Sequence, residues 1–289
     1  QVQQGGVWSV NVPGSDLAAL ADSGYTVQVS VSDAAGNSGS AGKTITLDAT
    51  PPTVSFNVVA GDDVINSVEH GQAQIVSGSA TGANVGDKVV ITLGSHQYTT
   101  TVDASGNWSV GVPASVLGAL GEGNHTISVS VTDAAGNTGT GSHNVTVDTG
   151  LPSVSFNAIS DDNVLNAVEK GQDLSVSGTS ANLAEGTVVA VTLNGKNYTA
   201  TTAADGTWSL TVPAADLAGL GEANYILSAS ATNGVGNSVS NTANLLVDTA
   251  LPTVTINTVA GDNVINAAEV AAGQTLSGKV ANAEAGNTV

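Results

Sequence analysis

The sequence contains no cysteine, no methionine and no arginine, and aromatic residues make up only 3% of it. Without cysteine the chain forms neither disulfides nor thiolate metal sites. The few aromatic rings argue against extended carbohydrate recognition. Five lysines face 24 acidic residues, and the formal net charge is -19. Such an acidic surface repels phosphate backbones and anionic lipid headgroups, which excludes nucleic acid as a partner and leaves divalent cations as favourable ones.

Long apolar runs are also missing. No segment reaches the roughly 18 apolar residues of a membrane-spanning helix, so we expect no direct insertion into a membrane. The 35 glycines and the 41% hydrophobic content are typical of a folded, globular chain with many turns.

The dominant feature is internal repetition at an interval of one hundred residues. Tryptophan, proline and aspartate recur in register at Trp8, Trp108 and Trp208, at Pro13, Pro113 and Pro213, and at Asp48, Asp148 and Asp248. This interval is the length of one sandwich domain and is too long for a solenoid repeat. The sequence therefore predicts tandem domains.

Each repeat has the pattern of short β-strands. In HTISVSVTD (125–133), Ile127, Val129 and Val131 alternate with hydroxyl residues, as in a strand with one buried face. Further strand-like runs lie at 53–58, 74–78, 88–93, 97–102, 107–112 and 143–148. Seven or so strands per repeat predict an all-β, immunoglobulin-like sandwich without a disulfide. The segment 112–122 has helical spacing, and we interpret it as a turn that covers the core, with Trp108 as a core residue.

The predicted domain boundaries follow from proline. Asp148 ends a strand and Pro152 follows, and the missing N–H and fixed φ of proline end a strand ladder. We expect complete domains at 50–149 and 150–249, the C-terminal half of a domain at 1–49, and the N-terminal half of another at 250–289. The chain is then a window from a longer array, arranged as an extended rod with very short linkers.

Oxygen-bearing side chains are concentrated in one stretch of each repeat. SDDNVLNAVEKG (160–171) closely matches AGDDVINSVEHG (60–71) and AGDNVINAAEVA (260–271). The alternation of strand direction predicts that this loop lies at the downstream end of its domain, while the hairpin 133–137 lies at the upstream end. Asp48 should therefore meet Asp133 and Asn137. Likewise, Asn233 and Asn237 should approach Asp148 from the next domain.

Carboxylates gathered at such junctions repel one another unless a cation neutralises them. Ca²⁺ fits, because it takes roughly six to eight oxygen ligands in flexible geometry, whereas Mg²⁺ demands a strict octahedron and Zn²⁺ prefers ligands that the chain lacks. The predicted metal ligands are Asp48, Asp62, Asp63, Asn66, Glu69, Asp133, Asn137, Asp148, Asp161, Asp162, Asn166, Glu169, Asp248 and Asp262. Asn233 stands where Asp33 and Asp133 occur, which predicts a weaker middle junction.

Purely structural interpretations remain open for part of this set. Asn66 with Glu69, and Asn166 with Glu169, have the spacing of a helix capping box. The DAAGN hairpin at 133–137 is also a good turn, with Gly136 suited to positive φ. Turn chemistry does not explain the aspartates at the strand ends or the adjacent Asp161 and Asp162.

An enzyme is not expected. All four histidines fall in one repeat, and no glycine-rich phosphate loop follows a strand into a helix. Asp62 and Asp63 are neighbours on a loop and lack the facing geometry of a glycosidase pair.

Three motifs, VDTGLPSVSFNAISDDNVLNAVE, SVTDAAGNTG and GTWSLTVPAADL, resemble the bacterial immunoglobulin-like repeats of giant, type I-secreted adhesins and biofilm-associated proteins, such as the large non-fimbrial adhesin of Salmonella. The resemblance spans the whole chain. It implies an extracellular stalk at the bacterial surface, Ca²⁺ at or near domain junctions, and host or biofilm partners bound elsewhere in the parent protein. The resemblance implies metal-binding roles for Asp133, for Asp48, Asp148 and Asp248, and for Asp62, Asp162 and Asp262 with their neighbours. Asn233 stands where the family pattern has the aspartate of Asp133, so it departs from that pattern.

Two functional hypotheses follow. In the first, the repeats are a Ca²⁺-stiffened spacer whose partners are neighbouring repeats of the same chain. In the second, the repeats themselves bind host glycans or other copies. Head-to-tail self-association through the complementary halves at 1–49 and 250–289 is one form of the second hypothesis.

Overall fold

The computed structural model describes residues 1–283 and 286–289. The chain divides into two compact units, Gln1–Thr149 and Gly150–Val289. β-Strands dominate both units, and none of the helices formed by the described residues has the length and apolar character needed to cross a membrane.

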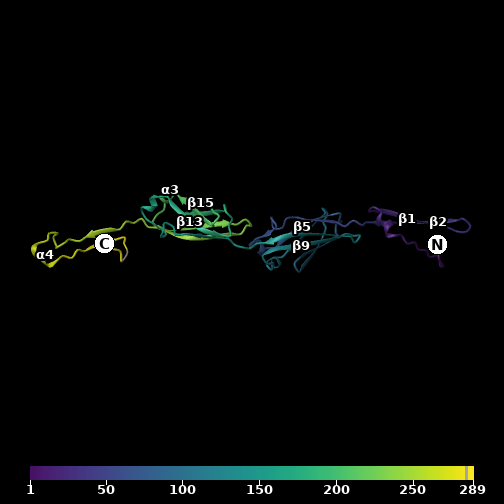
Figure 1. Cartoon of the computed structure of the whole chain (residues 1–289), viewed down its shortest axis with the longest axis horizontal. Coiled ribbons are helices and arrows are strands. Elements are labelled where there is room, and N and C mark those ends of the chain that lie inside the picture. Colours follow the sequence, from purple (N-terminus) through teal and green to yellow (C-terminus); the bar gives the residue numbers. More distant parts are fainter. Residues whose placement is uncertain (284–285) are drawn as a thin grey trace. The chain divides into compact units, whose positions relative to one another are not determined.

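The first unit begins with the short helix α1 (Gly14–Ala18) and an antiparallel hairpin of β1 (Ser23–Ser32) and β2 (Ser38–Leu47) (Figure 1). A sandwich follows, built from β3 (Thr53–Phe56), β4 (Val64–Ile65), the 3₁₀ turn η1 (Glu69–Gly71), β5 (Gln74–Thr81), β6 (Lys88–Leu93), β7 (His96–Thr101), β8 (Asn107–Val112), α2 (Ala114–Leu117), β9 (Gly123–Thr132) and β10 (Thr138–Val147). One sheet has the order β4-β10-β9-β6-β7 and the other β3-β5-β8. The pairing of β4 with β10 is parallel, and the other pairings are antiparallel.

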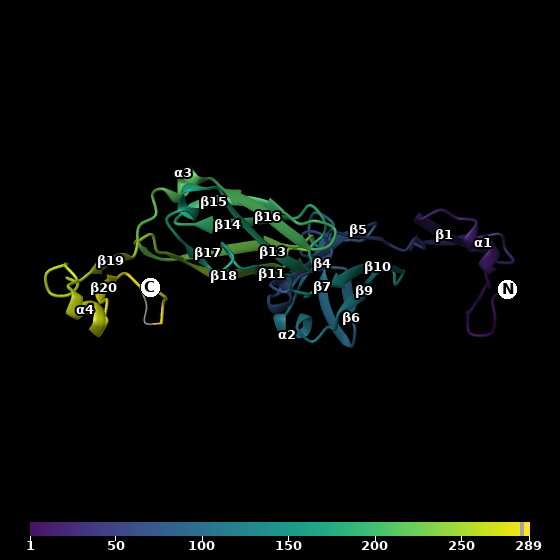
Figure 2. The same ribbon diagram turned by 60° about the vertical axis from the view of Figure 1, so that its left-hand side comes forward.

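The second unit contains the same sandwich with the same strand order (Figure 2). Its elements are β11 (Ser153–Phe156), β12 (Val164–Leu165), η2 (Glu169–Gly171), β13 (Leu174–Ala181), β14 (Val188–Leu193), β15 (Lys196–Thr201), β16 (Thr207–Val212), α3 (Ala214–Leu217), β17 (Ala223–Thr232) and β18 (Ser238–Val247). The hairpin-like pair β19 (Thr253–Ile256) and β20 (Gly278–Ala281) follows, with α4 (Ala267–Ala272) between them. The expected all-β sandwich without disulfides is therefore confirmed.

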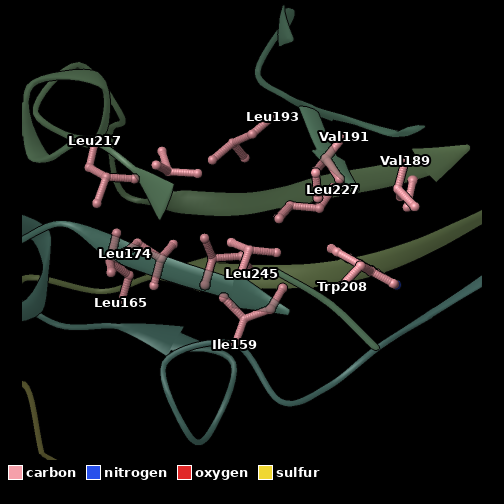
Figure 3. Packing of buried hydrophobic residues seen from close by; sticks show 14 of the residues in the cluster. Ile159, Leu165, Leu174, Val189, Val191, Leu193, Trp208, Leu217, Leu227 and Leu245 are labelled. Atoms are coloured by element: carbon pink, nitrogen blue, oxygen red, sulfur yellow. The ribbon is translucent and has the colours of Figure 1, made fainter. Parts of the chain in front are cut away.

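The core of each sandwich is built by residues that alternate along the strands. In β9, Ile127, Val129 and Val131 are 2% exposed or less, as their spacing predicts. In the second unit, Val191 and Leu227 face Trp208 between the two layers of ribbon (Figure 3). Burial of each such side chain contributes roughly 1.5–3 kcal/mol to folding.

Tryptophan packing joins the two layers. Trp108 is 2% exposed and meets Phe56 edge-on, with ring centroids 5.4 Å apart. Gly78 lies against this ring, and a Cβ at Gly78 would stand 1.9 Å from the carbonyl oxygen of Ser55 and 2.7 Å from Trp108. Trp108 is thus a core residue, as the sequence indicates, and the glycine is required by the close approach of β3, β5 and the indole.

The short helical segments match their predicted role as core covers. Leu117 of α2 is 2% exposed and belongs to the core of the first sandwich. The two-residue strand β4 was not expected from the sequence, because it is too short to show an alternation. In the third copy of the acidic stretch, EVAAGQ (269–274) allows the full helix α4 in place of the 3₁₀ turn.

Candidate functional site

The downstream end of each sandwich holds its linker through a glutamate that lies just before the β9 or β17 strand. Both carboxylate oxygens of Glu122 accept the backbone N–H of Thr149 at 3.2 Å, and the hydroxyl of Thr149 also donates to this carboxylate. Glu222 makes the same bonds to Thr249, with N–H distances of 3.0 and 3.1 Å. The threonine hydroxyl and then the backbone N–H lower the pKa of each glutamate.

Asp22 performs this role at the start of the chain. Its carboxylate accepts the N–H of Ala49 at 2.9 Å and the hydroxyl of Thr50. These bonds, the hydroxyl of Thr50 first, lower the pKa of Asp22 by more than desolvation raises it.

The hairpin between β9 and β10 is organised by Asp133, which is only 7% exposed. Its Oδ1 accepts the N–H of Asn137 at 2.8 Å, and its Oδ2 accepts the Asn137 side-chain amide at 3.0 Å. That amide, followed by backbone N–H groups, lowers the pKa of Asp133 in spite of its burial. Gly136 has φ +97°, as a turn of this kind requires. The turn interpretation of DAAGN is confirmed.

The same asparagine reaches across the linker between 1–49 and the first sandwich. The amide nitrogen of Asn137 lies 3.2 Å from the carbonyl oxygen of Asp48 and 3.3 Å from its Oδ1. Three oxygens, two of Asp48 and one of Asp133, thus converge on one nitrogen. The predicted contact of Asp48 with Asn137 is confirmed, Asp133 takes part through the same amide, and a metal role for these residues stays a prediction.

The acidic loop after β3 lies beside the end of β10, as strand direction predicts. The N–H of Asp148 donates to the carbonyl of Ile65 at 3.1 Å, next to the parallel pairing of β4 with β10. At the position shared by Asp62, Asp162 and Asp262, the aspartate closes a local turn by accepting the N–H two residues later. This bond joins Asp62 to Val64 at 3.0 Å, Asp162 to Val164 at 2.8 Å, and Asp262 to Val264 at 2.9 Å.

Asp63 is directed into its own sandwich. Its Oδ1 accepts the N–H of Val59 at 2.8 Å and lies 2.7 Å from Nε2 of His143, whose ring stacks on Phe56. Burial raises the pKa of Asp63, but the bonds from His143 and Val59 lower it by more. Asn163 makes the equivalent bond to its own loop. The side chain at this position holds the loop in place.

Asn66 and Glu69 form a reciprocal capping pair. Asn66 Oδ1 accepts the N–H groups of Val68 and Glu69 at 3.0 and 3.1 Å, and Glu69 Oε2 accepts the N–H of Asn66 at 3.1 Å. Asn166 and Glu169 repeat the arrangement at η2. Asn266 and Glu269 build a full capping box at the start of α4. The capping interpretation is therefore confirmed, and it leaves these residues' metal role untested.

The acidic loop of the second sandwich forms an open hollow. Asp161 and Glu169 line it together with Asp173, and Asp161 has the left-handed backbone φ of +61°. At the strand end, Asp248 Oδ1 accepts the N–H of Ala250 at 3.2 Å.

The turn that begins the second unit's β18 carries amides in place of a carboxylate. Asn233 Oδ1 accepts the N–H of Asn237 at 2.9 Å, and both side-chain amides donate to the carbonyl of Gly150 at 3.3 Å. The predicted approach of Asn233 and Asn237 to Asp148 stays a prediction.

The donor set at these linkers suits a hard divalent cation. Asp48 and Asp133 contribute two carboxylates and one main-chain carbonyl around a single point, without nitrogen or sulfur ligands of the kind that Zn²⁺ selects. Within residues 1–283 and 286–289, no three acidic, histidine or cysteine side chains gather closely enough to form a metal-ligand group. The chemistry of the oxygens fits Ca²⁺, while the assembled site contains only a pair of acids.

Comparison with known proteins identifies the family. A family model described as bacterial Ig-like domain matches residues 76–149. A solved structure of a Ca²⁺-stabilized adhesin with which an Antarctic bacterium reaches out and binds ice is 40% identical, covering 97% of this chain and 70% of that one, with a TM-score of 0.50. The chain belongs to the bacterial immunoglobulin-like adhesin repeats.

Another member of this repeat family is a structure from a 1.5-MDa bacterial ice-binding adhesin, studied for its retention on the host cell surface. It is 36% identical, covering 86% of this chain and 82% of that one, with a TM-score of 0.50. A single bacterial immunoglobulin-like domain from the M. primoryensis ice-binding adhesin is 46% identical over 35% of this chain and all of its own, with a TM-score of 0.30. No curated protein matches the sequence. The particular resemblance to the Salmonella adhesin stays a prediction.

Sequence reasoning missed the linker-anchoring acids of these immunoglobulin-like repeats. Asp22, Glu122 and Glu222 share one column of the repeat, and this in-register recurrence of an acid is the signal that could have revealed them. Their partners, Thr149 and Thr249, lie 27 residues further along the chain, so only the folded strands bring the two together.

Proposed function

We propose that this chain is a stalk segment of a large extracellular bacterial adhesin, in which Ca²⁺ bound at domain junctions stiffens a tandem array and projects an adhesive tip. The observation that carries the proposal is the contact of Asn137 with Asp48 across the linker, in which oxygens of Asp48 and Asp133 face the same amide. The Ca²⁺-stabilized adhesin among the similar structures supports the same chemistry.

The proposed joint works by charge. Without a cation, the like charges of Asp48 and Asp133 oppose a closed linker, and the one amide of Asn137 offsets them only in part. A divalent ion held by Asp48 and Asp133 would neutralise both carboxylates and favour one linker geometry. We further infer complete domains at 50–149 and 150–249, an extended arrangement, and surface export by type I secretion.

The backbone already prepares the linker for such a joint. Glu122 and Glu222 hold the residue after the last strand, so the chain leaves each sandwich in a set direction before any ion binds. The ion is then needed only to fix the contact with the following domain. Because the glutamate already orders this part of the linker, ion binding has less conformational entropy to remove.

The test is small-angle X-ray scattering of the whole chain with Ca²⁺ and then with chelator, with circular dichroism on the same samples. We expect the maximum dimension and stiffness to change on chelation while the β-sheet signal persists. The Asp133→Asn variant, which copies the residue found at 233, is the matched control and should respond less to Ca²⁺.

Unchanged dimensions in both conditions would overturn the calcium joint. The acidic clusters would then serve only as turns and caps, and a direct binding role for the sandwich faces, toward host surfaces, biofilm material or other copies, would become the function to pursue.

A further inference from the structure

The β9–β10 turn has the same sequence as its equivalent in the first copy, and the third copy differs from both at positions 233, 234 and 235. The turn begins Asp33–Ala34 in the first copy and Asp133–Ala134 in the second, but Asn233–Gly234 in the third. Asparagine followed by glycine is the dipeptide most prone to loss of the side-chain amide, because glycine has no Cβ to hinder the approach of its nitrogen. We propose that Asn233–Gly234 is a self-modification site at which Asn233 deamidates without an enzyme and yields the carboxylate found in the equivalent turns.

The reaction needs only water. The backbone nitrogen of Gly234 loses its proton to solvent hydroxide and attacks Cγ of Asn233, so that a new C–N bond forms. The Cγ–Nδ2 bond then breaks, and Nδ2 leaves as ammonia after taking up a proton from water. Hydroxide opens the resulting succinimide at either carbonyl, which gives aspartate or isoaspartate at position 233. No oxidant, reductant or cofactor enters the balance.

The structure activates the electrophile. Oδ1 of Asn233 accepts the N–H of Val235 at 3.2 Å and that of Asn237 at 2.9 Å. Two backbone donors on one carbonyl oxygen withdraw electron density from Cγ and stabilise the negative charge that develops on Oδ1 during attack. The turn thus presents the asparagine side chain in a small oxyanion hole.

The nucleophile is accessible. Gly234 is exposed, and apart from its two chain neighbours no residue has an atom within 4 Å of the place where its Cβ would be. Among the described residues, its backbone N–H donates to no acceptor, whereas the neighbouring Gly236 N–H is bound to the carbonyl of Asn233. Solvent can therefore remove the Gly234 proton without breaking a hydrogen bond.

The hydrogen-bond partners in this turn also suit an aspartate at position 233. In the second copy, Oδ2 of Asp133 accepts the Asn137 side-chain amide at 3.0 Å. In the third copy, the nitrogen of Asn233 is a donor and points with that of Asn237 at the carbonyl of Gly150. A carboxylate at 233 would replace this donor by an acceptor that the Asn237 amide can reach, as in the Asp133 turn.

The chain contains a natural reference for the rate. Asn194–Gly195 is the same dipeptide, in the turn between β14 and β15, with φ of +47° and +77°. Within the described residues, the side chain of Asn194 makes no hydrogen bond, so its Cγ lacks the polarisation that Asn233 receives. The two sites should lose ammonia at similar rates in the denatured chain, and Asn233 should be the faster site in the folded chain.

The experiment follows both sites in the full chain by peptide mass spectrometry with separation of isoaspartate, at mildly alkaline pH, folded and in denaturant. We expect faster conversion of Asn233 than of Asn194 in the folded chain only. Gly234→Ala, which copies Ala34 and Ala134, is the matched control and should slow conversion at 233 on the order of tenfold, because the Cβ hinders the attack. An intact Asn233 beside a converted Asn194 in the folded chain would overturn the proposal, as would an unchanged rate in Gly234→Ala.

The consequence for the stalk rests on the proposed function, while the chemistry does not. Conversion adds one negative charge to the turn that lacks it, so Asn233→Asp should respond more strongly to Ca²⁺ in scattering than the unmodified chain. Conversion of Asn233 with no difference in Ca²⁺ response would support the modification and count against the calcium joint.

Discussion

At the residue scale, the acids of this chain act first on the backbone. Asp62 and Asp133 accept N–H groups in turns, Glu69 caps a 3₁₀ segment, and Glu122 holds the linker. Each bond satisfies a donor that the short strands leave unpaired at their ends. A metal ligand and a turn residue are therefore compatible roles, since a carboxylate has acceptor sites beyond those used by one N–H group.

The Glu122 anchor makes a prediction about pH. Its folded pKa is lowered by Thr149, so the anchor is fully present above the pKa of an ordinary glutamate and is lost as the pH falls through the lower, folded value. We expect the Thr149 amide resonance in NMR to titrate with an apparent pKa below the ordinary range. Glu122→Gln should abolish that titration. A resonance that titrates equally in both proteins would contradict the anchor.

At the scale of the elements, the sandwich depends on close contact between strands and the buried indole. Gly78 of β5 pairs with Trp108 of β8 and with Phe56 of β3, so three strands meet at one backbone position. Gly178 has the same surroundings in the second sandwich. A methyl group has no room there, because the nearest atom is a main-chain oxygen that belongs to a paired strand.

Gly78→Ala should therefore destabilise the first sandwich on the order of 3 kcal/mol, through overpacking and displacement of β3. Gly111→Ala, on β8 and with open space around its Cβ, is the matched control and should change stability by less than about 0.5 kcal/mol. Urea unfolding of the full chain, followed by circular dichroism, measures both. Equal stability of the two variants would show that β3 moves freely away from β5.

At the scale of the whole molecule, the two complete sandwiches share one strand order, and the charge of the turn at one end differs between them. Most core positions of the two sandwiches correspond, although Val129 and Val131 of the first are Ala229 and Ala231 in the second, while the turn equivalent to 133–137 changes from carboxylate to amide in the third copy. Unequal ends predict joints of unequal strength, because the charge available to a cation differs.

Limited proteolysis tests this arrangement. In chelator, we expect faster cleavage in the segments around 48–52, 148–152 and 248–252, because a linker that is not held by a cation samples extended conformations that a protease accepts. The bodies of the sandwiches should resist cleavage in both conditions. Cleavage inside β9 or β17 on chelation would instead mean that the ion stabilises the fold of each sandwich.

Periodicity and residue spacing were enough to predict the all-β class, the repeat length, the core face of β9 and the place of the acidic loop beside Asp148, because strand periodicity and alternating direction are local rules that apply along the whole chain. The sequence also predicted the contact of Asp48 with the turn at 133–137. The bond of Asp63 to His143 and the bond of Glu122 to Thr149 could be found only in the folded chain. Those partners are far apart in the chain, and the choice between a linker, a histidine and solvent depends on which strands the fold brings alongside each carboxylate.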